Sequence, residues 1–218
     1  MTRVLRDRRG AFGALVLLVV LICAAGAPLV TSGDPSTQRD IVATRFLPPF
    51  STDVHGDFHP IGTDRFGRDV WTRLVFGARI SMGVGVLAVL VSLVLGVIIR
   101  AIAGYWRGPI SVAMLGLTDF ALALPPVVLL LLLAALWRPS TALVIVVLGL
   151  TGWMSIARVV HGEVRALAAR PFVEGAVAVG ARRLRVLARH ILPNALTPVI
   201  VAAALGVGNA IMLEAGMS

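Results

Sequence analysis

The sequence predicts an all-α integral membrane protein, and three observations support this fold class. Of the 218 residues, 58% are hydrophobic and 14% are charged, and the mean hydropathy is +0.92. Soluble domains carry about twice that charged fraction, so this composition cannot supply an aqueous surface. The apolar residues also gather in runs long enough to cross a bilayer as helices. Finally, the arginines concentrate in the segments between alternate runs, as they do in multi-pass membrane proteins.

The first apolar run follows a short basic segment. A basic tail, residues 1–10, precedes the run at residues 11–30. A basic start followed by an apolar stretch also fits a signal peptide, but this run is long for a signal core and has the length of a span. We therefore expect an uncleaved first span.

The rest of the chain divides into one polar segment and one apolar core. Residues 31–79 are rich in Pro, Gly and Asp and lack the apolar periodicity of an independent domain, so we expect an extramembrane segment. The core, residues 80–218, contains four further apolar runs, and a polar loop at 158–193 precedes the last of them. The four expected spans are residues 80–103, 110–137 with a break near Pro125 and Pro126, 141–157, and 195 to about 216.

The arginines predict which side of the membrane each segment faces. The net charge is +3 for residues 1–10, +2 for 100–109 and +5 for 158–190, whereas 31–79 is neutral. Cytoplasmic loops carry an excess of basic residues, so we expect a cytoplasmic N-terminus and an extracytoplasmic 31–79 segment. Five spans place Ser218 outside, so we expect a sixth span beyond the sequence given.

Composition also bears on the function classes. Basic residues that face the cytoplasm and orient the spans in the membrane account for the net charge of +9. An aromatic content of 6% is too low for base-stacking platforms, so we expect no nucleic-acid partner. A single cysteine, Cys23, allows no internal disulfide. His55 and His59 share a face only in a helix, and the run between them is a poor helix former, so no metal site is expected. The chain contains no P-loop, so ATP is expected to bind another subunit.

The loop at 158–193 is the most informative stretch. Residues 161–169 can continue the preceding helix out of the membrane, and Pro171 suits the first position of a new helix because a missing N–H costs nothing there. Gly180 is expected to end this short helix in a left-handed conformation. A second helix, residues 182–190, then leads to Pro193. The apolar residues of the short helix, at helical spacing, are Phe172, Val173, Ala176 and Val179.

A short helix with an apolar face requires something that buries this face. The residues alone allow two partners, a lipid surface with arginines on anionic headgroups or a cytosolic protein. Glu174 has two interpretations as well. In the first turn its charge favours the helix dipole, and it can also contact a partner or brace the loop.

A resemblance distinguishes these alternatives. The loop resembles the EAA loop of ABC importer permeases. Its matching pattern is Glu174-Gly175-Ala176, three residues, Gly180, nine residues and then His190-Ile191-Leu192-Pro193. Gly175 stands where the EAA loop has alanine, and His190 where it has isoleucine. The resemblance implies that the loop contacts the ATPases through a coupling helix. The residues implied in this contact are Pro171, Phe172, Glu174, Ala176, Gly180, Leu192 and Pro193.

A second stretch is similar to the H-P-L-G-T-D-x-x-G-R-D motif of the dipeptide, oligopeptide and nickel permease family. Its residues are His59-Pro60-Ile61-Gly62-Thr63-Asp64-Arg65-Phe66-Gly67-Arg68-Asp69. Short polar side chains beside glycines favour turns closed by local hydrogen bonds. We therefore expect Asp64, Arg68 and Asp69 to hold the turns around Gly62 and Gly67. The residues that match the motif are Gly62, Thr63, Asp64, Gly67, Arg68 and Asp69.

Together the motifs imply a type I ABC importer permease fold with a six-span core, of which five spans are visible. The implied protein is a multi-pass subunit of the bacterial inner membrane that passes di- or oligopeptides, with nickel, glutathione and haem-related cargo also found in the family. The implied partners are a second homologous permease subunit, cytosolic ABC ATPases that bind ATP and Mg, an extracytoplasmic solute-binding protein and membrane lipid. No catalytic residue or bound cofactor is implied in this chain.

The runner-up class is a secondary transporter or a channel, which needs ionisable relays inside the spans. Only two acidic residues fall within the expected spans, Asp119 and Glu214. Asp119 is expected either to pair with Arg100, Arg107 or Arg158 or to serve the pathway. Glu214, near the outer end of its span, can reach the interface.

Overall fold

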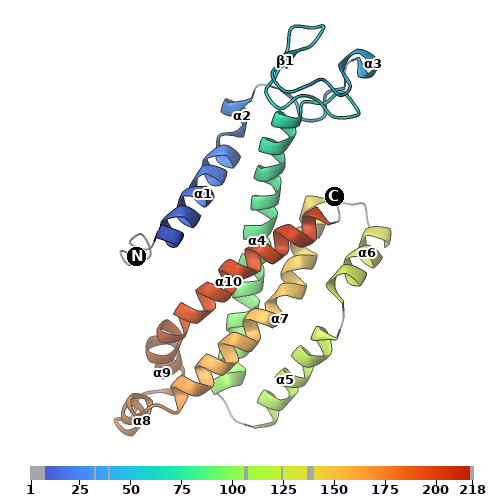
Figure 1. The fold of residues 1–218 in the computed structure, drawn as a ribbon. Helices are drawn as coiled ribbons and strands as arrows, with labels where there is room; N and C mark the ends of the chain where they lie inside the picture. The colour runs from blue at the N-terminus through green and yellow to red at the C-terminus, as the bar shows by residue number, and fades with distance from the viewer. Residues whose placement is uncertain are drawn as a thin grey trace. The chain divides into compact units, whose positions relative to one another are not determined.

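The computed structural model describes residues 8–31, 33–38, 40–105, 108–123, 125–136 and 140–216 (Figure 1). The described residues are mostly helical, as predicted, and form two compact units, 1–83 and 84–218. Helix α4 (Val70–Tyr105) begins in the first unit and ends in the second. Residues 1–7 of the predicted tail and the end at Ser218 lie outside the described residues.

The first unit contains the predicted first span and the folded 31–79 segment. Helix α1 (Arg8–Ala25) ends at Gly26, whose N–H donates to the Ile22 carbonyl over 2.8 Å, and the single turn α2 (Ala27–Val30) follows. The polar segment contains α3 (Ile41–Thr44) and an antiparallel pair of short strands, β1 (Ser51–Thr52) and β2 (Phe58–His59). The hydroxyls of Thr31 and Thr72 lie 2.6 Å apart and connect the end of α2 to the first turn of α4.

The second unit is a helical bundle built around α7 (Thr141–Ala168), which packs against α10 (Leu192–Ala215), α5 (Pro109–Leu122) and α6 (Pro126–Leu136) (Figure 1). Small residues bring α7 close to α4. The Ser92 hydroxyl donates to the Gly149 carbonyl over 2.9 Å. A Cβ on Gly96 would lie 3.0 Å from the Trp153 carbonyl oxygen. Small side chains at helix contacts are typical of membrane proteins, where close backbone approach stabilises association.

Among the described residues, three helical stretches are long and apolar enough to cross a membrane, namely residues 70–101, 141–168 and 183–215. These helices overlap the predicted spans at 80–103, 141–157 and 195–216, and each extends beyond the apolar run on which its prediction rested. The predicted first and third spans contain shorter apolar helices, Ala11–Ala25 and Ser111–Phe120, and as complete spans they stay predictions. The break expected at Pro125 and Pro126 separates α5 from α6.

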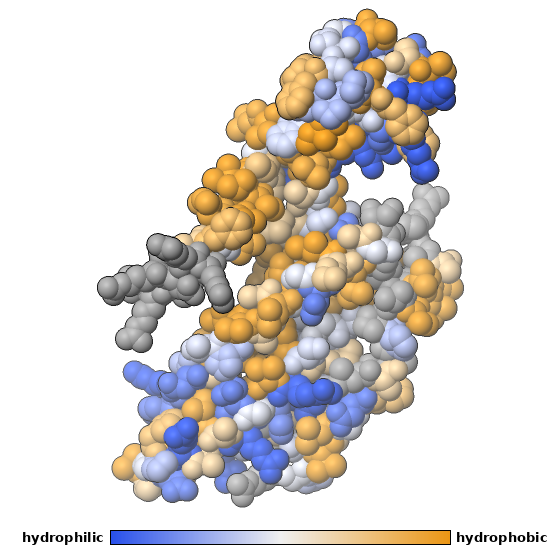
Figure 2. Space-filling view, in the orientation of Figure 1, coloured by the Kyte–Doolittle hydropathy of each residue, from blue (hydrophilic) through white to orange (hydrophobic). Residues whose placement is uncertain are grey.

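The interior of the second unit is apolar, and so is much of its surface. Val147, Val164 and Ile191 are buried in one cluster shared by α7, α10 and the loop between them. Exposed large apolar side chains follow α10, where Ile200 and Leu205 are each more than half exposed. Figure 2 shows apolar side chains over α10 and hydrophilic side chains at the end of this unit that carries α8 and α9. This distribution fits a surface that lipid or another subunit covers.

Candidate functional site

The loop after α7 contains a short helix, α8 (Pro171–Ala178), as the sequence predicted. Arg170 precedes it in an extended conformation with φ −84° and ψ 146°, and Pro171 occupies the first turn. Proline is favoured there because its fixed φ suits a helix and its absent N–H would have no partner. α7 continues to Ala168, so its last turns carry the chain beyond the apolar run, as expected.

Gly180 ends α8 with a φ of +83°. Its N–H donates to the Val177 carbonyl over 2.9 Å, and the N–H of Ala181 donates to the Ala176 carbonyl over 3.1 Å. These two bonds, from the first and second residues after the C-cap, constitute a Schellman motif. The left-handed helix end expected from the sequence is therefore present, and it satisfies carbonyls that the helix end leaves unpaired.

The apolar stripe of α8 is divided between the interior and the surface. Val173 is 4% exposed and joins the core cluster of the second unit, and Ala176 packs against that cluster. Phe172 and Val179 lie outside this cluster and are 45% and 86% exposed. The prediction that a partner buries the whole stripe is therefore too broad, because half of it already packs on the loop's own helices. The remaining exposed apolar residues of this surface are Phe172, Val177 and Val179.

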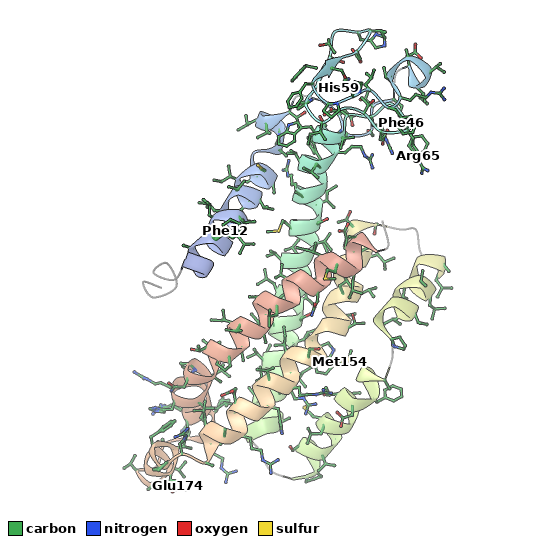
Figure 3. The ribbon with its side chains drawn as sticks, in the orientation of Figure 1. Phe12, Phe46, His59, Arg65, Met154 and Glu174 are labelled. Carbon is green, nitrogen blue, oxygen red and sulfur yellow. The ribbon has the colours of Figure 1, made fainter. Side chains whose placement is uncertain are left out.

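Glu174 is exposed on the first turn of α8 (Figure 3). Its backbone N–H points back to the Arg170 carbonyl at 3.4 Å. In this place its carboxylate faces the positive end of the helix dipole and stays accessible to a partner. The structure therefore keeps both interpretations of Glu174 open.

The second predicted helix of the loop is shorter and less regular than expected. α9 covers Arg183–Val186, and a π-helical turn, Leu187–Ile191, connects it to α10. The N–H of Leu192 donates to the Leu187 carbonyl, five residues back. Pro193 explains the irregularity, because proline cannot donate and its ring clashes with the carbonyl four residues earlier in a regular helix. The widened turn relieves this conflict without breaking the helix.

The second motif folds into a set of tight turns in the first unit. Gly62 and Gly67 have φ values of +83° and +71°. A Cβ on Gly62 would collide with the Leu47 carbonyl oxygen, and one on Gly67 with the Thr44 hydroxyl. Both glycines are therefore required by conformation and by space. Buried Thr63 connects the same segments, since its hydroxyl donates to the Thr44 carbonyl and accepts the Leu47 N–H.

Asp64 closes the turn at Gly67, as predicted. One carboxylate oxygen accepts the N–H groups of Phe66 at 2.8 Å and Arg68 at 3.0 Å, and the other accepts the Arg68 guanidinium. The Arg68 Nη2 lies 2.7 Å from this second oxygen. Burial raises the pKa of Asp64, but the hydrogen bonds from Arg68 and Phe66 outweigh it, so the net pKa is lowered.

Asp69 connects this motif to α4. One carboxylate oxygen accepts the N–H of Thr72 over 2.7 Å, the geometry of a helix N-cap. The other lies 3.0 Å from Nδ1 of His59, whose Nε2 is 3.6 Å from Asp53 (Figure 3). His59 is therefore held between two carboxylates and is 7% exposed. Sequence reasoning placed His59 at the start of the second motif and weighed it as a metal ligand, but it missed this arrangement, because the spacing of Asp53, His59 and Asp69 carries no local signal.

His55 and His59 do not lie on a common helix, since His59 belongs to β2 and His55 to a turn. Within the described residues, no group of three or more His, Cys, Asp and Glu side chains is arranged to hold a metal ion. A cavity of about 610 Å³ adjoins His59 within the first unit. Its polar lining includes Asp34, Asp53 and Asp69.

Asp119 is exposed on α5 and acts electrostatically on Arg100 of α4. Ion pairs among the described residues join His59 to Asp53 and Asp69, and Asp64 to arginines of its own segment. Arg107, one of its predicted partners, lies outside the described residues. The pairing and the pathway role of Asp119 both stay predictions.

Comparison with known proteins agrees with the fold and the two motifs. Residues 92–218 match the family of binding-protein-dependent transport system inner membrane components. A putative peptide transport system permease protein of Brucella abortus is 35% identical over 99% of this chain and 70% of its own length. The oligopeptide transport system permease protein OppC of Bacillus subtilis is 33% identical over the whole chain and 69% of its own length. The dipeptide permease protein DppC of the same organism is 34% identical, over 99% and 65%.

The apolar helices and the family match define a multi-pass membrane permease. The chain belongs to the family of binding-protein-dependent transport inner membrane components, the permease subunits of ABC importers. Permeases of this class operate with ATPases and a solute-binding protein in general.

Proposed function

We propose that this chain is the permease subunit through which di- or oligopeptides cross a bacterial inner membrane, with ATP hydrolysed on separate cytosolic subunits. The names of the similar Brucella and Bacillus proteins support peptides as the cargo. A binding protein delivers the peptide from outside, and a second homologous permease subunit completes the passage. The N-terminus is cytoplasmic, in keeping with the arginine distribution.

The observation that carries the coupling proposal is the exposed half of the α8 stripe. Phe172, Val177 and Val179 present apolar surface at the outer side of a loop whose other half is anchored in the core by Val173. Because α8 contacts α9, and α9 continues through the π-helical turn into α10, a displacement of α8 is transmitted to α9 and α10. Docked ATPases that change shape on binding ATP would therefore shift these helices between two arrangements.

The rigid C-terminus of α8 supports the same role. A Schellman motif at Gly180 fixes the angle at which the chain leaves the short helix. The π-helical turn at Leu187–Ile191 lies between α9 and α10 and has buried residues at both ends, Leu187 and Ile191. A helix that is well ended and packed on one side moves as a body, which a coupling element requires.

The test is uptake by the complete importer, reconstituted with its ATPases and binding protein in vesicles. We expect accumulation of a labelled di- or oligopeptide that requires ATP and the binding protein. Uptake driven by an ion gradient without ATP would instead support a secondary transporter. Parallel assays with nickel, glutathione and haem test the other cargoes, and ATP-dependent uptake of one of these without peptide uptake would overturn peptide as the substrate.

A further inference from the structure

The second unit contains a basic pocket where α4, α5 and α7 come together. The pocket has a volume of about 290 Å³ and lies between the end of α4, the start of α5 and the last turns of α7. The Ser111 hydroxyl donates to the Ala103 carbonyl over 2.7 Å and holds the first two of these helix ends together. Its lining includes Tyr105, Ser111, His161 and Arg165.

The charge around this pocket is predominantly positive. Arg165 lines it beside the uncharged hydrogen-bonding group of His161, and Arg100 acts electrostatically on His161. Arg158 adds a further positive charge near Arg100, and Asp119 is the acidic group that acts on Arg100. Glu163 is two residues from both His161 and Arg165, which places it on another side of α7.

Polar atoms in this cluster lack hydrogen-bond partners among the described residues. Arg100 is 2% exposed, and its Nε and Nη1 atoms have no partner there. Nδ1 of His161 is buried and likewise without one. A buried guanidinium is costly unless an anion or hydrogen-bond acceptors compensate it. Arg100 does not itself line the pocket, and the unpartnered atom within the lining is Nδ1 of His161, which can donate to an acceptor that a ligand supplies.

The position of the pocket indicates the source of the anion. The span predicted for α4 ends at residue 103, which lines the pocket, so the pocket lies at the level where lipid headgroups are expected. Basic pockets between helix ends bind lipid phosphates, and guanidinium groups match phosphate geometry.

An apolar track runs from the same pocket along α5. Val112 lines the pocket and is 69% exposed, and exposed Gly116 and Phe120 follow it at intervals of four residues on the same helix face. A cationic pocket at the end of an exposed apolar stripe is complementary to an amphiphile. It offers contacts to a phosphate and to an acyl chain together. A free anion would use only the first kind of contact, and a polar peptide would use neither fully.

We propose that this pocket binds the phosphate of an anionic phospholipid, with His161 and Arg165 at the headgroup and an acyl chain along Val112, Gly116 and Phe120. The site is distinct from the exposed α8 surface, and it does not depend on which solute the importer carries. Because it joins α4 and α5 to α7, the helix that leads into the coupling loop, a bound lipid restrains the relative positions of these helix ends.

The experiment uses the complete importer, purified in mild detergent and titrated with phosphatidylglycerol against a phosphatidylcholine background. Native mass spectrometry counts the retained anionic lipid. We expect the variant His161→Gln/Arg165→Gln to bind phosphatidylglycerol at least about tenfold more weakly than wild type, because it loses two charge-assisted contacts. Arg165→Lys keeps the charge without the planar fork, and we expect an intermediate affinity.

The matched control is Arg189→Gln, which removes an exposed charge from the same end of the unit but outside the pocket. We expect wild-type retention from it. Equal loss in Arg189→Gln and the double variant would indicate general surface attraction and overturn the site. Wild-type retention in the double variant would overturn it as well.

A second arm distinguishes the source of the anion. Inorganic phosphate at millimolar concentration should leave lipid retention unchanged, because it lacks the acyl chain. If inorganic phosphate displaces the retained lipid, the pocket is a free-anion site. If wild type retains no lipid at all, protein groups of the complex fill the pocket. Either result contradicts the lipid assignment. Co-elution of all subunits in each variant establishes that the fold is intact.

Discussion

Gly180 provides a sharp test of the coupling loop. Its φ of +83° lies in the left-handed region, and no atom lies within 4 Å of the position that a Cβ would take. A substitution therefore meets no steric obstacle, and its cost is the conformational cost alone, about 1 kcal/mol or slightly more. This reduces the population of loops with the correct helix end by roughly fivefold. Binding of a partner to that conformation is weakened by the same factor.

We therefore expect Gly180→Asp to insert normally while the permease binds its ATPases several-fold more weakly. The assay is ATP hydrolysis by the reconstituted importer, stimulated by loaded binding protein, together with co-purification of the ATPases. Gly180→Asn should be milder, because asparagine tolerates the left-handed region better than most residues.

The matched control is Gly175→Ala in the same helix. Gly175 lies inside α8, and a Cβ there also meets nothing within 4 Å. Alanine should stabilise the helix by up to about 1 kcal/mol, so stimulation should be equal to or above wild type. Wild-type stimulation and complete co-purification in Gly180→Asp would refute the reasoning, and they would favour a loop that merely lies on lipid.

Three further predictions concern the first unit and the topology. Gly67→Ala should destabilise the folded 31–79 segment more than Gly56→Ala does. Both glycines have positive φ, but only a Cβ at Gly67 would meet the Thr44 hydroxyl, and limited proteolysis of the two variants measures the difference. Because the pKa of Asp64 is lowered in the folded state, its carboxylate stabilises the 31–79 segment fully above the ordinary pKa of 3.8, and this stabilisation is lost as the pH falls through the lower folded value. The protease sensitivity of wild type should therefore rise below about pH 4, whereas that of Asp64→Asn should change little. In a cysteine-free background, Val54→Cys should react with an impermeant thiol reagent from outside and Ala169→Cys only after the membrane is opened, and the reverse pattern would show the opposite orientation.

The elements that the sequence predicted well are those governed by local rules. Apolar runs located the three long helices, and adjacent prolines located the break between α5 and α6. Pro171 and Gly180 located both ends of α8, because each residue type has a strong conformational preference at a helix end. The hydrogen bonds of the Asp64 carboxylate are equally local, because its donors Phe66 and Arg68 lie within four residues.

The features that escaped prediction depend on contacts between distant residues. Nothing in the loop shows that Val173 turns inward while Phe172 stays exposed, because this depends on how α8 rests against the core. The π-helical turn follows from Pro193 only once the helix is known to continue through it. His59 between Asp53 and Asp69, and the pocket shared by α4, α5 and α7, likewise bring together residues that no short-range pattern connects.

The central claim is that the exposed apolar face of α8 docks on the ATPases. Its most direct test places a single cysteine at Val177, 46% exposed on α8, in a variant without Cys23, and treats the assembled importer with a photoactivatable thiol cross-linker. Leu184→Cys on α9, 65% exposed, is the control for a residue outside that face. We predict a covalent permease–ATPase product from position 177 and little from 184. If position 177 labels freely with a thiol reagent in the intact complex and forms no such product, the docking of α8 is contradicted.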